Sequence, residues 1–149
     1  MTTNTFISPS WDIKSRHCIL PESTIRDNQD KVDWYNISWS QDLSEAFIRE
    51  FQDRLDWSRL CWKQDLSEEF IREFQDRVDW SEISATNRIL SEDFIREFQD
   101  KINWDSVSYY QTLSRNFILE FQGKLDLEYI LEYQQLDPET REYLLLLEG

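Results

Sequence analysis

Tryptophan returns at a nearly constant interval along this chain, and this period constrains the fold more than any other feature. The marker residues are spaced 23, 23, 23, 24 and 23 positions apart: Trp11, Trp34, Trp57, Trp80, Trp104 and Leu127. Three central copies share an almost identical phrase: LSEAFIREFQD at 43–53, LSEEFIREFQD at 66–76 and LSEDFIREFQD at 90–100. A period of this length is typical of stacked supersecondary units. The sequence therefore divides into a flexible tail, residues 1–10, and one helical-repeat domain, residues 11–149, with six repeats: 11–33, 34–56, 57–79, 80–103, 104–126 and 127–149.

Each repeat is expected to contain two short helices. In the second helix, Ser67 suits an N-cap, and Phe70, Ile71 and Phe74 then fall on one face at helical spacing. We expect about 12 residues in this helix and about 8 in the first, which begins at the tryptophan. Helices this short cannot bury their apolar faces alone, so neighbouring repeats must stack. The sequence predicts an all-α solenoid of six tandem two-helix repeats.

The polar face of the second helix carries Glu and a basic residue four positions apart, an arrangement that stabilises a helix by roughly 0.2–0.5 kcal/mol per pair. The predicted pairs are Glu45–Arg49, Glu50–Arg54, Glu68–Arg72, Glu73–Arg77, Glu92–Arg96, Glu97–Lys101 and Glu120–Lys124. Acidic clusters on this face, such as Glu68, Glu69, Glu73 and Asp76, are therefore interpreted as a solvated ion-pair surface and not as a cation site.

The outermost repeats depart from the pattern, as expected of the caps of a solenoid. The first has Pro21, Thr24 and Asn28 where the central repeats have Ser and two Phe, and the last has Pro138, Thr140 and Leu144 in place of the Ser-and-Phe pattern.

The consensus W-x-x-I-x-x-x-Q-x-L-S-E-x-F-I-R-E-F-Q-D-K/R-V-D-W is carried most closely by residues 57–80 and 80–104. It resembles a short repeat found in proteins of giant viruses and of some other large DNA viruses and phages. The resemblance covers residues 11–149, and the outer copies follow it more loosely. It implies a viral origin, a cytoplasmic location and a helical-repeat fold, and it implies no catalytic residues.

Composition excludes several classes of function. The formal charge is −14, from 16 basic and 30 acidic residues, which argues against direct binding to nucleic acid or to anionic membranes. This charge suits a basic partner, or only solubility. No leader is expected in residues 1–10, and the longest apolar run, 144–147, is too short to span a bilayer. Cys18 and Cys61 lack metal-site spacing, which favours a reduced, intracellular chain.

No constellation of catalytic residues is evident, so we expect no enzyme activity, no cofactor and no metal. His17 and Cys18 are sequence neighbours, which point to different faces of a helix, and the only glycines are Gly123 and Gly149. A polar residue follows each marker from Trp34 onward by seven positions: Gln41, Gln64, Asn87, Gln111 and Gln134. These amides either grip an extended ligand or satisfy backbone groups at the turn between helices, and the second interpretation is favoured.

The residues that do not repeat carry the functional hypothesis. Positions one, two, five and six after the marker vary between repeats and are expected to be exposed, Asn36 among them. The candidate partner-binding residues are Tyr35, Trp39, Arg59, Trp62, Lys63, Glu82, Tyr109, Tyr110, Tyr129 and Tyr133. Exposed aromatic patches are typical of contact surfaces, whereas the regularly repeated Trp and Phe follow the core period.

The leading hypothesis is a non-catalytic viral module, monomeric or weakly self-associating, that binds and modulates or inhibits a host protein. One alternative is an acidic mimic of nucleic acid that blocks a DNA- or RNA-binding protein such as a defence nuclease. A second is a self-assembling structural protein that stacks through its apolar end, residues 143–147.

Overall fold

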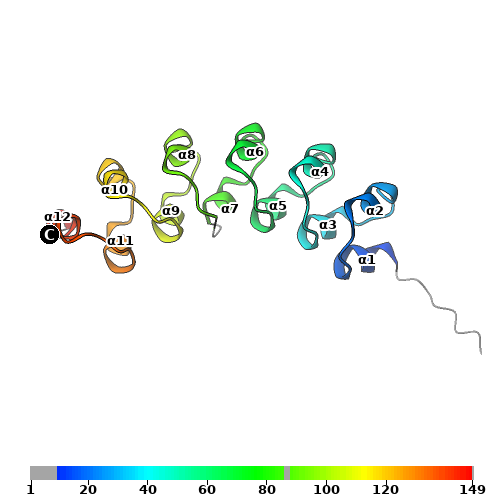
Figure 1. Ribbon diagram of the computed structural model, residues 1–149, viewed down its shortest axis with the longest axis horizontal. Coiled ribbons are helices and arrows are strands. Elements are labelled where there is room, and N and C mark those ends of the chain that lie inside the picture. Colours follow the sequence, from blue (N-terminus) through cyan, green and yellow to red (C-terminus); the bar gives the residue numbers. More distant parts are fainter. Residues whose placement is uncertain (1–9, 86–87, 149) are drawn as a thin grey trace, which may run out of the picture. The chain divides into compact units, whose positions relative to one another are not determined.

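The computed structural model describes residues 10–85 and 88–148, and all regular structure in these residues is helical (Figure 1). The predicted solenoid of tandem two-helix repeats is confirmed, because a short helix led by Trp or Leu alternates with a second helix along the chain. The helices are α1 (Trp11–His17), α2 (Glu22–Asp27), α3 (Trp34–Ser40), α4 (Glu45–Glu50), α5 (Trp57–Lys63), α6 (Glu68–Glu73), α7 (Trp80–Ala85), α8 (Glu92–Glu97), α9 (Trp104–Tyr110), α10 (Arg115–Phe121), α11 (Leu127–Tyr133) and α12 (Pro138–Glu148). Of the predicted tail, residues 1–9 lie outside the described part, and Ser10 is the N-cap of α1.

The described helices form two compact bodies, the N-terminal body (residues 10–77) and the C-terminal body (residues 78–85 and 88–148). Within the N-terminal body, the short helices α1, α3 and α5 pack side by side, and α2, α4 and α6 lie along the opposite edge (Figure 1). Within the C-terminal body, α9 packs between α7 and α11, and α12 packs against α11. None of the described helices is both long and apolar enough to cross a bilayer.

Each of the four central repeats folds around a tryptophan that packs on two phenylalanines of the same repeat. In the third repeat the Trp57 ring lies 6.3 Å from Phe70 and 5.0 Å from Phe74, and the Arg77 guanidinium lies 5.1 Å from the Trp57 ring. Phe70 is fully buried. The repeated aromatics are therefore the scaffold, as predicted.

The second helix is shorter than predicted in the central repeats. Each of α4, α6 and α8 has six residues, because at Phe51, Phe74 and Phe98 the chain enters a turn. The N–H of Arg54 donates to the carbonyl of Phe51 at 2.9 Å, three residues back instead of four. This turn leaves the carbonyl of Gln52 to accept the indole N–H of Trp57 at 3.0 Å. A continuous helix would have engaged that carbonyl within the backbone.

A buried serine in the short helix joins consecutive repeats. Ser38 Oγ donates to the carbonyl of Trp34 at 2.7 Å and accepts the backbone N–H of Asp56, the N-cap of the next short helix, at 2.9 Å. Ser15, Ser84 and Ser108 make the same two contacts, with Asp33, Asn103 and Asp126 as donors. Cys61 occupies the equivalent position in α5 and is fully buried.

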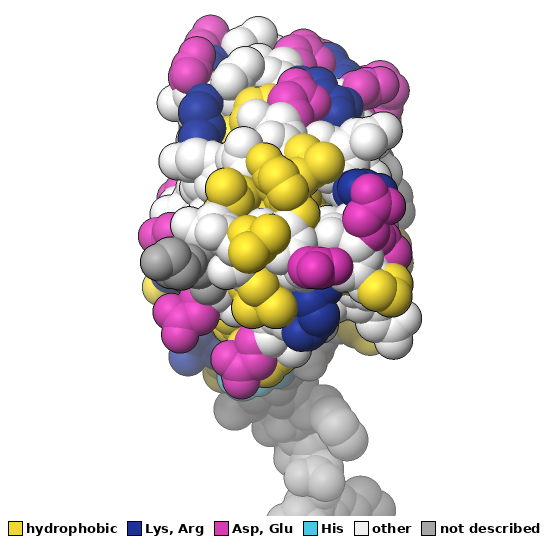
Figure 2. Space-filling view, turned by 90° about the vertical axis from the view of Figure 1, so that its left-hand side faces the viewer, with side chains coloured by type: hydrophobic (Ala, Val, Ile, Leu, Met, Phe, Trp, Pro, Cys, Tyr) yellow, Lys and Arg dark blue, Asp and Glu magenta, His cyan; other side chains and the backbone are white. Residues whose placement is uncertain are grey.

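The C-terminal body ends in an apolar surface on α12. Tyr143, Leu145, Leu146 and Leu147 are between 42% and 76% exposed, whereas Leu144 is fully buried. Figure 2 shows hydrophobic side chains gathered on this end of the body. Asp137 caps the helix by accepting the backbone N–H of Thr140 at 2.9 Å and its hydroxyl at 2.5 Å.

Ion pairs run along the second helices, and only part of the predicted set is present. Glu45–Arg49, Glu68–Arg72 and Glu92–Arg96 are confirmed at 3.6–3.7 Å. The predicted pairs of Glu50, Glu73 and Glu120 with a base four residues later are wrong. These glutamates pair with an arginine of the preceding repeat, as Arg26–Glu50, Arg49–Glu73 and Arg96–Glu120, at 2.7–2.9 Å.

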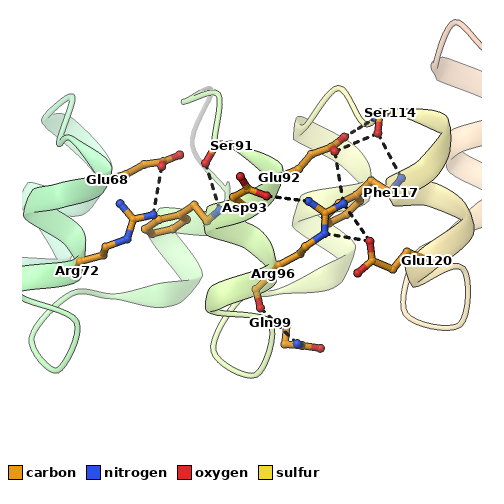
Figure 3. Close-up of polar contacts among 11 residues, drawn as sticks. Glu68, Arg72, Ser91, Glu92, Asp93, Arg96, Gln99, Ser114, Phe117 and Glu120 are labelled. Atoms are coloured by element: carbon orange, nitrogen blue, oxygen red, sulfur yellow. Dashed lines mark hydrogen bonds and ion pairs between the residues drawn. The ribbon is translucent and has the colours of Figure 1, made fainter.

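The early end of the helix explains this difference. Arg54 and Arg77 lie beyond the last helical residue, where the spacing of four no longer brings side chains together, and they reach back to Asp30 and Asp53. Figure 3 shows the resulting network in the C-terminal body, where Arg96 lies over the Phe117 ring and contacts Asp93 and Glu120.

Candidate functional site

Two exposed tryptophans form the centre of a surface on the short helices of the N-terminal body. Trp39 on α3 and Trp62 on α5 stack with ring centroids 4.7 Å apart and planes inclined by 11°, and they remain 47% and 54% exposed. The N-terminal aromatic surface consists of Tyr35, Trp39, Arg59, Trp62 and Lys63. All five are predicted candidates; the structure brings Tyr35, Trp39, Arg59 and Trp62 together, and Lys63 follows Trp62 at the end of α5.

The charged residues of this surface are held by neighbours. The Arg59 guanidinium lies 3.7 Å from the centre of the Tyr35 ring, donates to the Tyr35 hydroxyl, and pairs with Asp56 at 3.0 Å. Lys63 pairs with Asp42 at 2.7 Å. Arg59 and Lys63 lie on α5 and contact Tyr35 and Asp42 of the preceding repeat. The surface is therefore continuous from α3 to α5.

A pocket of about 290 Å³ opens beside the tryptophans. It is lined by Arg16, Tyr35, Asn36, Trp39 and Arg59. The prediction that Asn36 is exposed is wrong. It is 4% exposed, since its amide nitrogen donates to Asp33 at 2.7 Å and its oxygen accepts Nε of Arg16 at 3.3 Å.

Arg16 is a lining residue that the sequence analysis missed. It lies five positions after Trp11, the repeat position that Trp39 and Trp62 occupy in the next two repeats. Comparing this first, atypical repeat with the others at that position would have found it.

The C-terminal tyrosine surface, Tyr109, Tyr110, Tyr129 and Tyr133, lies on α9 and α11. The ring of Tyr109 lies 4.5 Å from Tyr129 and 4.7 Å from Tyr110, and Tyr129 lies 4.4 Å from Tyr133. Tyr129 is half-buried between its neighbours, and the other three are 43–61% exposed. All four are predicted candidates, and they form one cluster.

Two tyrosines of this surface have a raised pKa, Tyr129 and Tyr133. Partial desolvation, followed by the proximity of Tyr109, raises the pKa of Tyr129. A hydrogen bond to Glu132 raises the pKa of Tyr133. Both hydroxyls are therefore engaged with neighbouring side chains within the surface, and the exposed ring faces are what it offers to a partner.

Glu82 differs from the other candidates. It is half-buried on α7, and its backbone N–H donates to the side chain of Asp79 at 3.3 Å, which is a capping contact. No ring contact or ion pair among the described residues joins Glu82 to either aromatic surface.

Comparison with models of known families, with curated proteins and with solved structures gives no match. The geometry of the chain itself therefore carries the functional argument.

The ladder of amides binds the chain's own backbone and not a ligand. Gln64 donates from Nε2 to the carbonyl of Gln41 at 2.7 Å, and its Oε1 accepts the N–H of Leu43 at 3.0 Å. Gln41, Gln111 and Gln134 make equivalent pairs of contacts. The favoured interpretation is confirmed, with the refinement that each amide bonds to the inter-helix segment of the preceding repeat. Asn87 lies outside the described residues.

The groups considered for chemistry lie apart. His17 ends α1, and the exposed Cys18 follows as its C-cap, whereas Cys61 is buried in α5. Within the described ranges, no group of three or more His, Cys, Asp or Glu side chains is arranged to hold a metal ion.

Proposed function

We propose that this protein is a non-catalytic binding module that holds a partner protein through the exposed aromatic side chains of its short helices. The observation that carries the proposal is the pair of exposed clusters, the N-terminal aromatic surface and the C-terminal tyrosine surface. Six of their aromatic side chains are 43–61% exposed although they lie in a solenoid whose other rings are largely buried. Large, rigid aromatics supply contact area at low entropic cost and are enriched at protein interfaces.

The contrast between scaffold and surface supports this function. Positions that pack, such as Ile37, Leu60 and Val107, are fully buried and similar between repeats. Positions that face outward change from Trp and Arg in one body to Tyr and Glu in the other. A uniform scaffold with a variable outer face is how repeat proteins build a binding surface. Together with the resemblance of the consensus to a viral repeat, this supports the proposal of a viral protein that acts on a host protein in the cytoplasm.

The arrangement of charge favours protein binding over mimicry of nucleic acid. Arg26, Arg49 and Arg96 alternate with acidic side chains along the second helices, each within 4 Å of two carboxylates. Such a surface has mixed charge, whereas a nucleic-acid backbone presents an unbroken row of negative charge.

Capture of a partner tests the proposal. The wild type and a Trp39→Ala, Trp62→Ala, Tyr109→Ala triple variant are compared in pull-downs from host lysate at moderate salt. A double variant, Ile19→Ala with Ile89→Ala, is the control, since both isoleucines are highly exposed and lie off the two surfaces. We expect a protein retained by wild type and control and lost by the triple variant. Equal retention by all three would remove the aromatic surfaces from the proposal.

Self-assembly through α12 is a second candidate, favoured by the exposed apolar end of the C-terminal body (Figure 2). Leu146 is the most exposed of its leucines, at 76%. Sedimentation velocity over a concentration series tests it. A sedimentation coefficient that rises with concentration in wild type and not in Leu146→Glu would favour assembly, and a constant value in both would exclude it.

A further inference from the structure

The pocket beside Trp39 combines two guanidinium groups with aromatic walls in a chain that is otherwise acidic. Residues 1–77 hold 10 basic and 15 acidic residues, a formal charge of −5. The lining residues Arg16 and Arg59 come from α1 and α5, on either side of α3.

Arg16 is the cation without a compensating acid. It is exposed, its Nε donates to the Asn36 side chain, and it forms no ion pair within the described residues. The amide of Asn36 is itself fixed by Asp33 at 2.7 Å, so one edge of the guanidinium is positioned while its terminal N–H groups remain available.

The neighbouring acids are already engaged. Asp33 caps α3 by accepting the N–H groups of Tyr35 and Asn36, and Asp56 caps α5 and pairs with Arg59. These carboxylates therefore do not occupy the terminal N–H groups of Arg16, which stay free to bind an added anion. Arg59 is held over the Tyr35 ring and presents its remaining donors from a fixed position.

The wall of the pocket suits an apolar group. The exposed faces of Trp39 and Tyr35 line it, and the stack of Trp39 on Trp62 extends the flat surface beyond the rim. A volume of about 290 Å³ accommodates one or two side chains and not a folded element. The matching surface in the C-terminal body carries tyrosines with Glu128 and Glu132, so this combination of cation and ring belongs to the N-terminal body.

We propose that this pocket binds a carboxylate of a partner peptide, from an acidic side chain or a C-terminus, that lies next to an aromatic or aliphatic side chain. Arg16 and Arg59 donate hydrogen bonds to the carboxylate, and the apolar neighbour packs on Trp39. Guanidinium groups suit this role because their planar donors match the two carboxylate oxygens. This inference rests on the proposed function and adds the chemistry of the partner. The segment of the partner that enters the pocket carries a carboxylate, although this chain is itself acidic.

A fragment titration followed by NMR tests the pocket in the full chain. The probes are 3-phenylpropionate, its neutral amide and phenyl phosphate. We expect 3-phenylpropionate to shift the Arg16 Nε–H and the Trp39 indole N–H saturably, and the amide to bind about tenfold or more weakly, because it lacks the charged hydrogen bonds. Tighter binding of phenyl phosphate than of the carboxylate would overturn the assignment in favour of a phosphate site.

Two matched variants locate the effect. Arg16→Gln should weaken 3-phenylpropionate about tenfold or more, since a charge-assisted hydrogen bond is lost. Lys14→Gln removes the same charge from the same helix, where Lys14 lies against Trp11 outside the pocket, and should change the affinity less than about twofold. An equal loss of affinity in both variants would show that only the net charge of the protein matters, and this would overturn the proposal.

The fragment titration and the partner capture test different claims, so a negative result in one does not imply a negative result in the other. Absence of shifts at the lining residues would refute the carboxylate pocket, and loss of a captured partner in the aromatic triple variant would still support the binding module. Specific fragment binding with no surface-dependent partner would refute the proposed function and leave the pocket as a site for small carboxylates.

Discussion

Gln64 illustrates how one side chain holds two repeats in register. It is 7% exposed, and its amide bonds to both the carbonyl of Gln41 and the N–H of Leu43 in the preceding repeat. The extended segment between α3 and α4 has no partner strand, so its buried polar groups need side-chain partners. The amide supplies a donor and an acceptor from one residue, which is why Gln suits this position.

Replacing Gln64 with Leu is expected to lower the free energy of unfolding by roughly 1–3 kcal/mol for each of the two backbone groups left unsatisfied. Urea unfolding followed by tryptophan fluorescence measures the loss. Gln134→Leu is the control, because Gln134 makes equivalent bonds but is only half-buried, so that water replaces them. An equal loss in both variants would show that burial of the bonds is not the cause.

At the scale of the element, the period of the sequence was sufficient to predict which segments form helices and where they begin. The predicted cap Ser67 accepts the backbone N–H of Phe70 in the first turn, and the short helix α5 begins at Trp57 as expected. Helix ends were predicted less well. The apolar spacing continues through Leu55, which is buried, yet the backbone leaves the helix at Phe51. Periodicity reports which side chains face the core, and a tight turn can satisfy the same spacing as a helix.

The candidate surface was predicted only in part, because periodicity predicts which positions are exposed but not which side chains of adjacent repeats meet. Positions outside the packing stripe were correctly expected to expose Trp39 and Trp62, and their stacking follows from adjacent repeats. The burial of Asn36 and the role of Arg16 depend on a contact between residues 20 positions apart. Such a contact is set by how far one repeat is displaced along the next, which a single sequence does not encode at the level of side chains.

Helix α12 is the element whose docking is expected to depend on pH. Hydrogen bonds from Thr140 lower the pKa of Asp137, and the Arg115 side chain lowers the pKa of Glu139. A depressed carboxyl pKa contributes stability above the pKa of the unfolded chain, and this contribution is lost as pH falls through the folded value. Carboxyl titration by NMR should place both midpoints below those of the same residues in the urea-unfolded protein.

Two variants distinguish the effect of Thr140 on the pKa of Asp137 from the effect of Arg115 on the pKa of Glu139. Thr140→Val removes the hydroxyl with little change in volume and should raise the pKa of Asp137, with less effect on Glu139. Arg115→Gln should act mainly on Glu139, which it contacts at 3.0 Å. Unchanged midpoints in both variants would refute the assigned contacts.

At the scale of the whole molecule, stability is built from contacts between neighbouring repeats. The amides, the buried serines and the bonds Arg26–Glu50 and Arg96–Glu120 each join one repeat to the next. Both compact bodies use the same bonds, but their charges differ. The N-terminal body has a formal charge of −5 and the C-terminal body, with 6 basic and 15 acidic residues, has −9. In a chain held together by such bonds, a substitution in one repeat is expected to destabilise that repeat and its neighbours and to leave distant repeats unchanged.

Hydrogen exchange tests this locality with two equivalent substitutions. Ile48 on α4 and Ile118 on α10 occupy the same repeat position and are fully buried, so Ile→Val at each should cost about 0.5–1.5 kcal/mol. We expect Ile48→Val to speed amide exchange about 2- to 13-fold in α2–α6 and to leave α9–α12 unchanged, and Ile118→Val to do the reverse. The local response is expected because the amide, serine and ion-pair bonds of the described residues join adjacent repeats. If either variant sped exchange equally in both bodies, the chain would unfold as one cooperative unit, and bonds between adjacent repeats would not suffice to explain its stability.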